Sequence, residues 1–222
     1  MEKTQIANNL QKVSHQLKEN TTVVVVTKTR THQEVEEAIE GGALTIGENR
    51  VQEAEKKFNQ IKKINKVEKR LIGPLQSNKV KRAIKTFDVI DTVGTVRLAK
   101  KISEEAKKIN KKQRVLLQIN STEIKERNGF SFEEESKILE CFMLKNIKIE
   151  GFMTMGPNTQ NKQTIKRAFL RTAELYKKIN NKKQNQMTTL SMGMSGDFEW
   201  AIAEGSTMLR LGTALFGARD VF

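Results

Sequence analysis

The hydrophobic positions along the chain follow two alternating patterns. Short apolar runs rich in valine, isoleucine and leucine predict β-strands, and VVVV at residues 23–26 is the clearest of them. Between these runs, apolar residues recur at every third or fourth position, which predicts amphipathic helices. The expected strands span residues 23–27, 44–46, 71–73, 88–93, 115–120, 147–154, 188–192 and 208–212. The expected helices span residues 2–17, 32–40, 51–64, 79–85, 95–109, 132–143, 164–179 and 198–203.

This strict alternation of strand and helix favours a parallel sheet with right-handed crossovers. Eight such units predict closure of the sheet, so we expect an α/β fold of the TIM-barrel type, (β/α)8, with one extra helix at the N-terminus. An open, doubly wound sheet is the alternative. The chain has only two prolines and no Ser/Gly-rich linker, which predicts that residues 1–222 form a single domain.

Composition argues against several classes of protein. No segment has the roughly 20 apolar residues of a membrane span, and the N-terminal sequence MEKTQIANNLQKV does not resemble a signal peptide. The single cysteine, Cys141, rules out an internal disulfide, which fits the reducing cytoplasm, and we expect a buried core thiol. His15 and His32 form no metal-ligand pattern with Cys141, so we expect no metal.

The charge of the chain is strongly positive, with 40 basic and 26 acidic residues and a formal net charge of +14. Eleven basic residues but only one acid, Glu68, lie in the stretch from Lys56 to Lys85 inclusive. Such a patch attracts phosphates or nucleic acid. However, its lysines flank helical patterns at solvent-facing positions, no recognition motif accompanies them, and aromatic residues for base stacking are scarce. We therefore expect no nucleic-acid partner, and a basic nucleic-acid-binding or interaction module stays an alternative.

Candidate chemistry gathers where the strands end, because TIM barrels place their active sites at the carboxyl ends of the strands. The first strand ends in Lys28, within VVVVTKTR, and the last ends near Arg210. Between them lie GENR at residues 47–50, GPLQSN at 73–78, NST at 120–122, MTMG at 153–156 and MGMSGD at 192–197. The expected mouth of the barrel is therefore polar, glycine-bearing and cationic at two points.

The last two strand ends favour phosphate binding. Ser195, Gly196 and Asp197 open a helix, whose first backbone N–H groups point outward. Gly212 and Thr213 allow close backbone approach, and the loops after strands seven and eight are the usual phosphate site of a TIM barrel. The alternative is that Ser195 or Asp197 only caps a helix and that Gly212 only forms a turn.

The lysine at this mouth has two interpretations. When it is partly buried near another cation such as Arg210, its amine loses a proton more readily and attacks an aldehyde. An aldehyde that carries a phosphate is pyridoxal 5′-phosphate, so Lys28 is a candidate Schiff-base lysine. Alternatively, Lys28 pairs with Glu48 or another acid.

Five stretches carry a resemblance to a known family, and together they cover nearly the whole chain: VVVVTKT, IGENRVQE, LIGPLQSNKVK, GFMTMGP and LSMGMSGDFEWAIAEGSTMLRLGTALFGAR. In this order they resemble the YggS/PROSC family of pyridoxal phosphate homeostasis proteins. That family looks like the barrel domain of alanine racemase standing alone.

The resemblance implies that Lys28 forms an aldimine with pyridoxal 5′-phosphate. It also implies that Ser195, Gly212 and Thr213 hold the phosphate and that Arg210 faces the pyridine nitrogen. The residues expected near the ring are Asn49, Met153 and Met192.

The resemblance further implies a carrier of the cofactor and not an enzyme. A guanidinium donates a hydrogen bond without releasing its proton, so a pyridine nitrogen facing Arg210 stays unprotonated and the ring is a poorer electron sink. Racemases with such an arginine compensate with a tyrosine from an added domain of the partner chain. The sequence ends at Phe222, so we expect no such domain, and its only tyrosine, Tyr176, is expected mid-helix on the outside of the barrel.

We therefore expect a cytoplasmic monomer that binds pyridoxal phosphate, takes part in its homeostasis and passes it to apo-enzymes. A slow racemase acting on a small amino acid is the alternative. Two positions depart from the family pattern. Pro74 stands where relatives usually carry histidine, in IGHLQ, and the loop INSTEIKERNGF has Arg127 as its nearest cation where a lysine is common.

Overall fold

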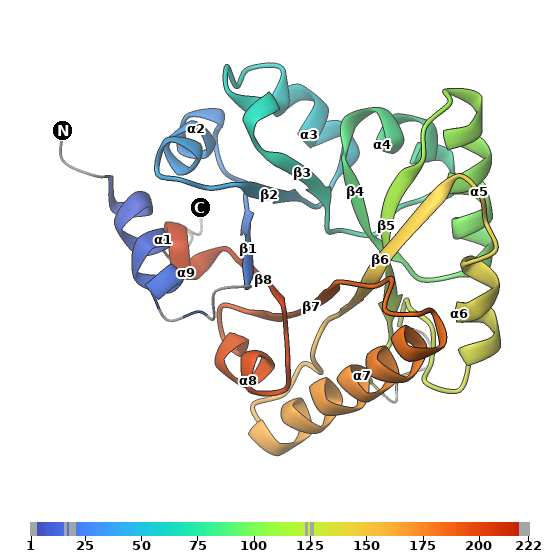
Figure 1. The fold of residues 1–222 in the computed structure, drawn as a ribbon. Coiled ribbons are helices and arrows are strands. Elements are labelled where there is room, and N and C mark those ends of the chain that lie inside the picture. Colours follow the sequence, from blue (N-terminus) through green and yellow to red (C-terminus); the bar gives the residue numbers. More distant parts are fainter. Residues whose placement is uncertain (1–3, 16, 18–20, 123, 125–126, 218–222) are drawn as a thin grey trace.

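An eight-stranded barrel forms the centre of the computed structural model, which describes residues 4–15, 17, 21–122, 124 and 127–217 (Figure 1). Each strand pairs in parallel with its neighbours in chain order, and β8 closes the barrel against β1, with Val23 opposite Leu209. The strands are β1 (Thr22–Val26), β2 (Thr45–Glu48), β3 (Glu68–Leu71), β4 (Val89–Val93), β5 (Gln113–Ile119), β6 (Ile147–Thr154), β7 (Thr189–Met194) and β8 (Met208–Leu211). The expected TIM barrel is confirmed, and the open sheet is excluded.

Helices surround the barrel and connect its strands (Figure 1). They are α1 (Gln5–His15), α2 (His32–Glu40), α3 (Val51–Phe58), α4 (Val80–Thr86), α5 (Val96–Lys108), α6 (Glu135–Cys141), α7 (Lys162–Lys182), α8 (Phe198–Ala203) and α9 (Thr213–Phe216). Two short 3₁₀ helices, η1 (Ile64–Lys66) and η2 (Ser77–Lys79), lie before β3 and α4.

Helix α1 is the extra helix expected before the first strand. It packs against α2 and α9 on the side of the barrel where β1 and β8 meet (Figure 1). Ile6, Leu10 and Val13 are buried on one face of α1, as the three- to four-residue spacing predicts. The side-chain amide of Asn9 donates a hydrogen bond to the carbonyl of Leu215 at 3.0 Å, which ties α1 to α9. Helix α9 itself has no counterpart among the expected elements.

The third strand is the clearest correction to the sequence pattern. The apolar residues place it at 71–73, whereas β3 spans Glu68–Leu71. Arg70 is only 1% exposed, because its guanidinium pairs with Asp91 inside the barrel and with Glu68. A hydrophobic pattern misses a strand whose buried side chain is an arginine with buried partners.

Two helices are also shorter than the pattern predicts. Helix α3 ends at Phe58 instead of residue 64, because the chain turns there and Ile61 is buried from the turn. Helix α6 spans Glu135–Cys141 instead of 132–143, and Phe132 lies before it, beneath the guanidinium of Arg171. The other observed boundaries lie within three residues of those expected.

Apolar residues form a continuous core between the strands and the helices. Val25 belongs to this core cluster, whereas Val24 and Val26 are also buried but lie outside it. Because side chains alternate along a strand, Val24 and Val26 face the interior of the barrel. Lys28 is two residues beyond Val26, so the same alternation would point its side chain toward the interior as well.

Cys141 is fully buried in α6, as expected of a core thiol. Burial raises the pKa of this thiol to about 12, and the nearby charge of Glu140 acts in the same direction. The thiol is therefore protonated at neutral pH. None of the described helices is long and apolar enough to cross a membrane.

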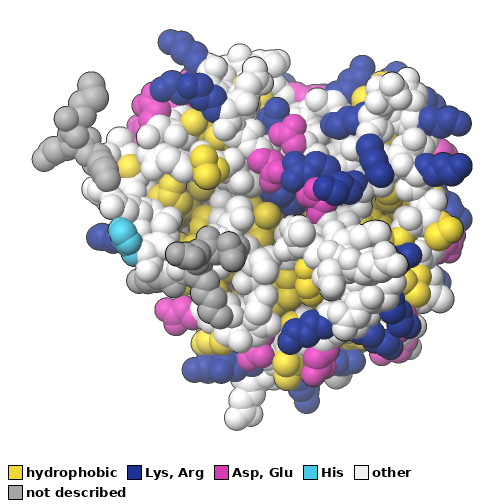
Figure 2. Space-filling view, viewed as in Figure 1, with side chains coloured by type: hydrophobic (Ala, Val, Ile, Leu, Met, Phe, Trp, Pro, Cys, Tyr) yellow, Lys and Arg dark blue, Asp and Glu magenta, His cyan; other side chains and the backbone are white. Residues whose placement is uncertain are grey.

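The basic residues are less concentrated in space than in sequence. Figure 2 shows Lys and Arg side chains gathered most densely at the upper right, where α4 and α5 lie in Figure 1. Within the stretch from Lys56 to Lys85, five of the eleven basic residues form ion pairs with carboxylates: Lys57, Lys63, Lys69, Arg70 and Arg82. The patch is thus weaker than its composition implies.

Candidate functional site

Lys28 follows β1 in a strained turn. Thr27 continues the line of the strand, because its N–H donates to the carbonyl of Gly47 at 3.0 Å. Thr29 then has a φ of 65°, a left-handed conformation that is costly for a β-branched residue. The N–H of Arg30 donates to the carbonyl of Thr27 at 3.1 Å and closes the turn. Strain of this kind persists only where neighbouring contacts hold the backbone, and it fixes the half-buried Lys28 at the carboxyl end of β1.

A buried ionic cluster holds the backbone just before Lys28. The carboxylate of Glu48 is fully buried, and its Oε1 accepts hydrogen bonds from Thr27 Oγ1 at 2.7 Å and from Lys57 Nζ at 2.6 Å. Lys57 Nζ also donates to the carbonyl of Thr27 at 2.7 Å. Residues from β1, β2 and α3 therefore fix one another. Glu48 thus forms an ion pair with Lys57.

The loops after β7 and β8 meet at Ser195. Its Oγ accepts hydrogen bonds from the N–H groups of Gly212, at 3.3 Å, and Ala214, at 3.2 Å, so Ser195 caps the short helix α9 from another loop. A Cβ added to the neighbouring Gly196 would meet no atom within 4 Å. The hydroxyl and the two N–H groups converge beside open space, and a phosphate group placed there would take the place of Ser195 Oγ as the acceptor of these N–H groups.

Asp197 shapes the same loop in another way. Its Oδ1 accepts a hydrogen bond from the N–H of Met194 at 2.6 Å, which closes the turn after β7. The side chain of Asp197 makes no capping hydrogen bond to α8. Asp197 therefore holds the turn in which Ser195 lies.

Arg210 lies within β8 and its side chain is buried in the barrel. Nη1 donates to Ser191 Oγ and Nη2 to the carbonyl of Thr154, both at 2.7 Å, so the guanidinium links β8 to β7 and β6. Burial lowers the pKa of Arg210 to about 10, while the charges of Asp91 and Asp197 oppose this shift. The guanidinium stays charged at neutral pH, and its Nε makes no hydrogen bond to any residue that the structure describes.

A second buried arginine, Arg70, pairs with Asp91, whose charge also acts on Arg210. Arg70 Nε lies 3.1 and 3.0 Å from the two carboxylate oxygens of Asp91, and Arg70 Nη2 lies 2.9 Å from Oδ1. Burial raises the pKa of Asp91, and the charges of Arg70 and Arg210 act against that rise. Arg70, Arg210 and Asp91 thus lie buried together inside the barrel.

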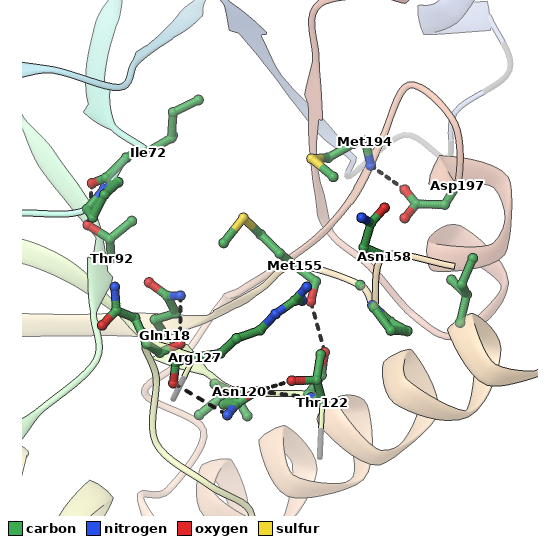
Figure 3. Close-up of a pocket in the computed structure, with 18 of the residues that line it drawn as sticks. Ile72, Thr92, Gln118, Asn120, Thr122, Arg127, Met155, Asn158, Met194 and Asp197 are labelled. Atoms are coloured by element: carbon green, nitrogen blue, oxygen red, sulfur yellow. Dashed lines mark hydrogen bonds between the residues drawn. The ribbon is translucent and has the colours of Figure 1, made fainter. Parts of the chain in front are cut away.

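A cavity of about 760 Å³ opens at the carboxyl ends of the strands (Figure 3). The loops after β2, β3, β5, β6 and β7 contribute its lining, and among the described residues none from β1 or β8 does. Of the expected site residues, Asn49 lines it, and Ser195 lies between the lining residues Met194 and Gly196. Lys28 follows β1 and Arg210 lies within β8, and neither residue lines the cavity. The same holds for Gly212 and Thr213, which follow β8 directly.

Asn49 is held in place by backbone packing. A Cβ added to Gly73 would come within 2.3 Å of the Asn49 carbonyl oxygen, so only glycine allows this approach. Met153 and Met192 are fully buried and line no part of the cavity, whereas Met155 and Met194 do.

Sequence reasoning assigned neither Met155 nor Met194 to the site. The pairing of β7 with β8 shifts register between Ser191 and Met194. A simple alternation count along the strand therefore cannot say which methionine reaches the mouth.

Further polar residues line the cavity that the motifs did not single out. They are Thr92, Gln118, Asn128 and Asn158. The two positions that depart from the family pattern, Pro74 and Arg127, line it as well. Across the described ranges, no three or more His, Cys, Asp or Glu side chains are placed to hold a metal ion.

Comparison with known proteins places the chain in a family. Residues 2–220 match the family model described as the alanine racemase N-terminal domain. The pyridoxal phosphate homeostasis protein of Synechocystis sp. is 36% identical over 198 residues, which are 89% of this chain and 91% of that protein. The pyridoxal phosphate homeostasis protein of Escherichia coli is 32% identical over 212 residues, 91% of this chain and 87% of that protein. The chain belongs to the pyridoxal phosphate homeostasis protein family. This confirms the membership that the five motifs predict.

Solved structures agree with this assignment. PipY of Synechococcus elongatus, solved without PLP, has a TM-score of 0.91 and 29% identity, and the match covers 96% of this chain and all of that one. PipY with PLP bound has a TM-score of 0.88 over the same shares. An alanine racemase of Clostridium difficile shares the fold at 18% identity and a TM-score of 0.80, over 98% of this chain and 57% of the racemase.

Proposed function

We propose that the chain binds pyridoxal 5′-phosphate at the carboxyl ends of β1, β7 and β8 and takes part in its homeostasis. One observation carries the proposal. The strained turn at Lys28 and the donor set around Ser195 and Gly212 lie on strands that adjoin one another, in a chain whose family relative PipY was solved with PLP bound. An amine and a phosphate site side by side suit a phosphorylated aldehyde.

In this proposal each residue has a distinct role. Lys28 supplies the amine, and Ser195, Gly212 and Thr213 hold the phosphate through a hydroxyl and backbone N–H groups. Arg210 faces the pyridine nitrogen. Asn49 and Met192 lie near the ring and limit its movement.

The cofactor supplies an aldehyde that condenses reversibly with amines, together with a ring that withdraws electrons. The buried guanidinium of Arg210 keeps its proton at neutral pH, so a ring nitrogen beside it receives a hydrogen bond and no proton. An unprotonated ring withdraws electrons weakly, which disfavours carbanion chemistry. Arg210 thus favours a site that holds the cofactor over one that drives racemisation.

The position of Tyr176 also favours a site that holds the cofactor over one that drives racemisation. Its hydroxyl donates to the carbonyl of Met187 at 2.8 Å, and its ring packs edge-on against Phe152. Tyr176 lies on α7, outside the barrel, and is the only tyrosine in the sequence. The chain therefore offers no tyrosine of its own at the mouth to act as a second base, and we propose a carrier without catalytic turnover.

The proposal extends to the setting in which the carrier works. A single buried thiol suits the reducing cytoplasm. We propose that the protein acts there as a monomer and releases the cofactor to apo-enzymes. An apo-enzyme acceptor is the natural partner of a reversible aldehyde carrier.

Equilibrium titration with pyridoxal phosphate tests the proposed function. Wild-type protein should develop the visible absorption band of a lysine-bound cofactor, and Lys28→Ala should not. Ser195→Ala should keep the band but bind more weakly, by about tenfold for one lost hydrogen bond to a charged group.

The same preparation, incubated with L-alanine, should form no D-alanine above the rate of free cofactor. Measurable turnover would favour the slow racemase instead. The absence of a band in wild-type protein would reject the proposal.

A further inference from the structure

A second recess lies beside the mouth of the barrel. It has a volume of about 250 Å³ and is bounded by the loop after β5, the loop after β6 and the first half of α7. Three arginines line it: Arg127 from the loop and Arg167 and Arg171 from α7. The last two are four residues apart, so they project from the same face of the helix. No aspartate or glutamate lines the recess among the residues that the structure describes.

Little in the described structure neutralises these arginines. None of the three forms an ion pair with a described carboxylate. Arg171 lies over the ring of Phe132 at 4.2 Å. The pKa of Glu133 is lowered first by a hydrogen bond from Ser131 and, less strongly, by Arg171, so Glu133 offsets part of one charge. No described carboxylate offsets the charges of Arg127 and Arg167, so the described residues that line the recess carry a net positive charge.

The donors that the recess offers to an anion are those of the guanidinium groups, together with the side chains of Asn158 and Thr164, which also line it. Ser121 Oγ already donates to the carbonyl of Met155 at 2.9 Å, and Thr122 Oγ1 donates to Asn120 Oδ1 at 2.7 Å. A guanidinium presents two parallel N–H groups that match the oxygens of a carboxylate or a phosphate. The recess can hold one such anionic group of a small molecule, and it is too small for a protein segment.

The recess is continuous with the mouth cavity. Ser121, Thr122, Arg127 and Asn158 line both spaces. Figure 3 shows the side chain of Arg127 extending from the loop after β5 toward Asn158 and Met155. A ligand can therefore place an anionic group among the arginines and extend its other end into the mouth cavity.

We propose that this arginine recess binds the carboxylate or phosphate group of a small metabolite whose other end lies in the mouth cavity. The identity of that other end, an amine directed at the cofactor site, rests on the proposed function. The binding of the anion does not, because it needs only the three arginines. The recess would thus select which small amines enter the mouth cavity.

Isothermal titration with glutarate and, separately, with inorganic phosphate tests the proposal. Both probes are added to protein saturated with pyridoxal phosphate, so that the cofactor's own phosphate site is filled. The variants are Arg167→Gln and Arg167→Gln/Arg171→Gln. The matched control is Lys166→Gln/Lys177→Gln, which removes the same two charges from α7, at residues that line no part of the recess.

At least one probe should bind wild-type protein, and each lost guanidinium should weaken binding by about tenfold. The control should change the affinity by less than about twofold, because neither lysine lines the recess and salt screens their charges. Glutarate binding would identify a carboxylate ligand, and phosphate binding a phosphate ester. Arg167→Gln removes no contact that the structure describes, so it should fold even if the double variant is destabilised by loss of the Phe132 contact.

The proposal is overturned if neither probe binds, if the arginine variants bind as wild type does, or if the control loses as much affinity. A protein that fails to take up pyridoxal phosphate would reject the proposed function instead. In that case the same titration on the unloaded protein, with glutarate alone, still decides whether the recess binds an anion.

Discussion

Replacing Asp91 by asparagine should destabilise the barrel more than any exposed charge change. Asp91 is fully buried and is the carboxylate that Arg70 contacts through both Nε and Nη2, at 2.9 to 3.1 Å. The charge of Asp91 also raises the pKa of Arg210 against the effect of burial. An asparagine has nearly the same shape, so Asp91→Asn leaves two buried guanidinium groups with less compensating charge and little change in packing.

The expected cost follows from the burial of the pair. Removing one partner of a buried ion pair typically lowers the free energy of unfolding by about 3–5 kcal/mol. For a chain of this size, each kcal/mol shifts the melting temperature by about 2–4 °C, so Tm should fall by roughly 6–20 °C. Urea unfolding followed by circular dichroism, with a thermal melt on the same samples, measures both quantities.

Two further variants make this test specific. Glu40→Gln breaks the exposed pair between Glu40 and Lys63 and should cost only about 0–1 kcal/mol. Arg70→Met/Asp91→Leu removes both charges of the buried pair, leaves only Arg210 charged there, and should be more stable than Asp91→Asn. The reasoning is refuted if Asp91→Asn costs less than about 1 kcal/mol, or if the double variant is the less stable of the two.

Three other predictions concern separate parts of the molecule. Desolvation alone would raise the pKa of Glu34, but hydrogen bonds from Thr31 and Arg30 lower it below 4.5. The ionised Glu34 therefore stabilises the fold fully above pH 4.5, and this stabilisation is lost as pH falls through the pKa of the folded state. Glu34→Ala should therefore cost up to about 1 kcal/mol at pH 7 and progressively less below pH 4.5, and a cost independent of pH in urea titrations would contradict this. Cys141, whose pKa burial raises to about 12, should resist a thiol reagent in the native protein at about pH 8 and react once urea unfolds it, so rapid native labelling would count against its burial. Gly73→Ala should lower Tm, because the new Cβ meets the Asn49 carbonyl oxygen at 2.3 Å, whereas Gly196→Ala enters open space and should leave Tm unchanged; equal melting temperatures for the two variants would disprove the close approach.

The sequence pattern predicts the barrel well because most strands bury valine, isoleucine and leucine on both faces. VVVV at residues 23–26 is such a strand, and Val24 and Val25 face opposite sides of it, one toward the interior and one toward the helices. The pattern fails at β3, where the buried inward residue is Arg70. Its partners, Asp91 and Glu68, lie elsewhere along the chain, and no local period reveals that pairing.

The candidate site also has a part that the sequence predicts and a part that depends on the closed barrel. Lys28 and Ser195 could be found from the sequence, because each lies at the end of a strand that is easily predicted. That Ser195 accepts hydrogen bonds from the amides of Gly212 and Ala214 depends on how two loops meet, which only the closed barrel determines. The register shift after Ser191 likewise decides which side chains reach the mouth.

The sequence alone does not predict the arginine recess, because its arginines lie far apart along the chain. Arg127 follows β5, whereas Arg167 and Arg171 lie on α7, some forty residues later in the chain. No motif joins them, and a lysine- and arginine-rich chain gives no reason to select these three. They come together because α7 packs beside the loop after β5.

The central claim is that Lys28 holds pyridoxal phosphate, and one measurement tests it most directly. The protein is mixed with equimolar cofactor, reduced with borohydride and digested, and the peptides are mapped by mass spectrometry. The account predicts a single modified peptide carrying the label on Lys28, with labelling lost in Lys28→Ala. Equal labelling of many surface lysines, unchanged in Lys28→Ala, would contradict it.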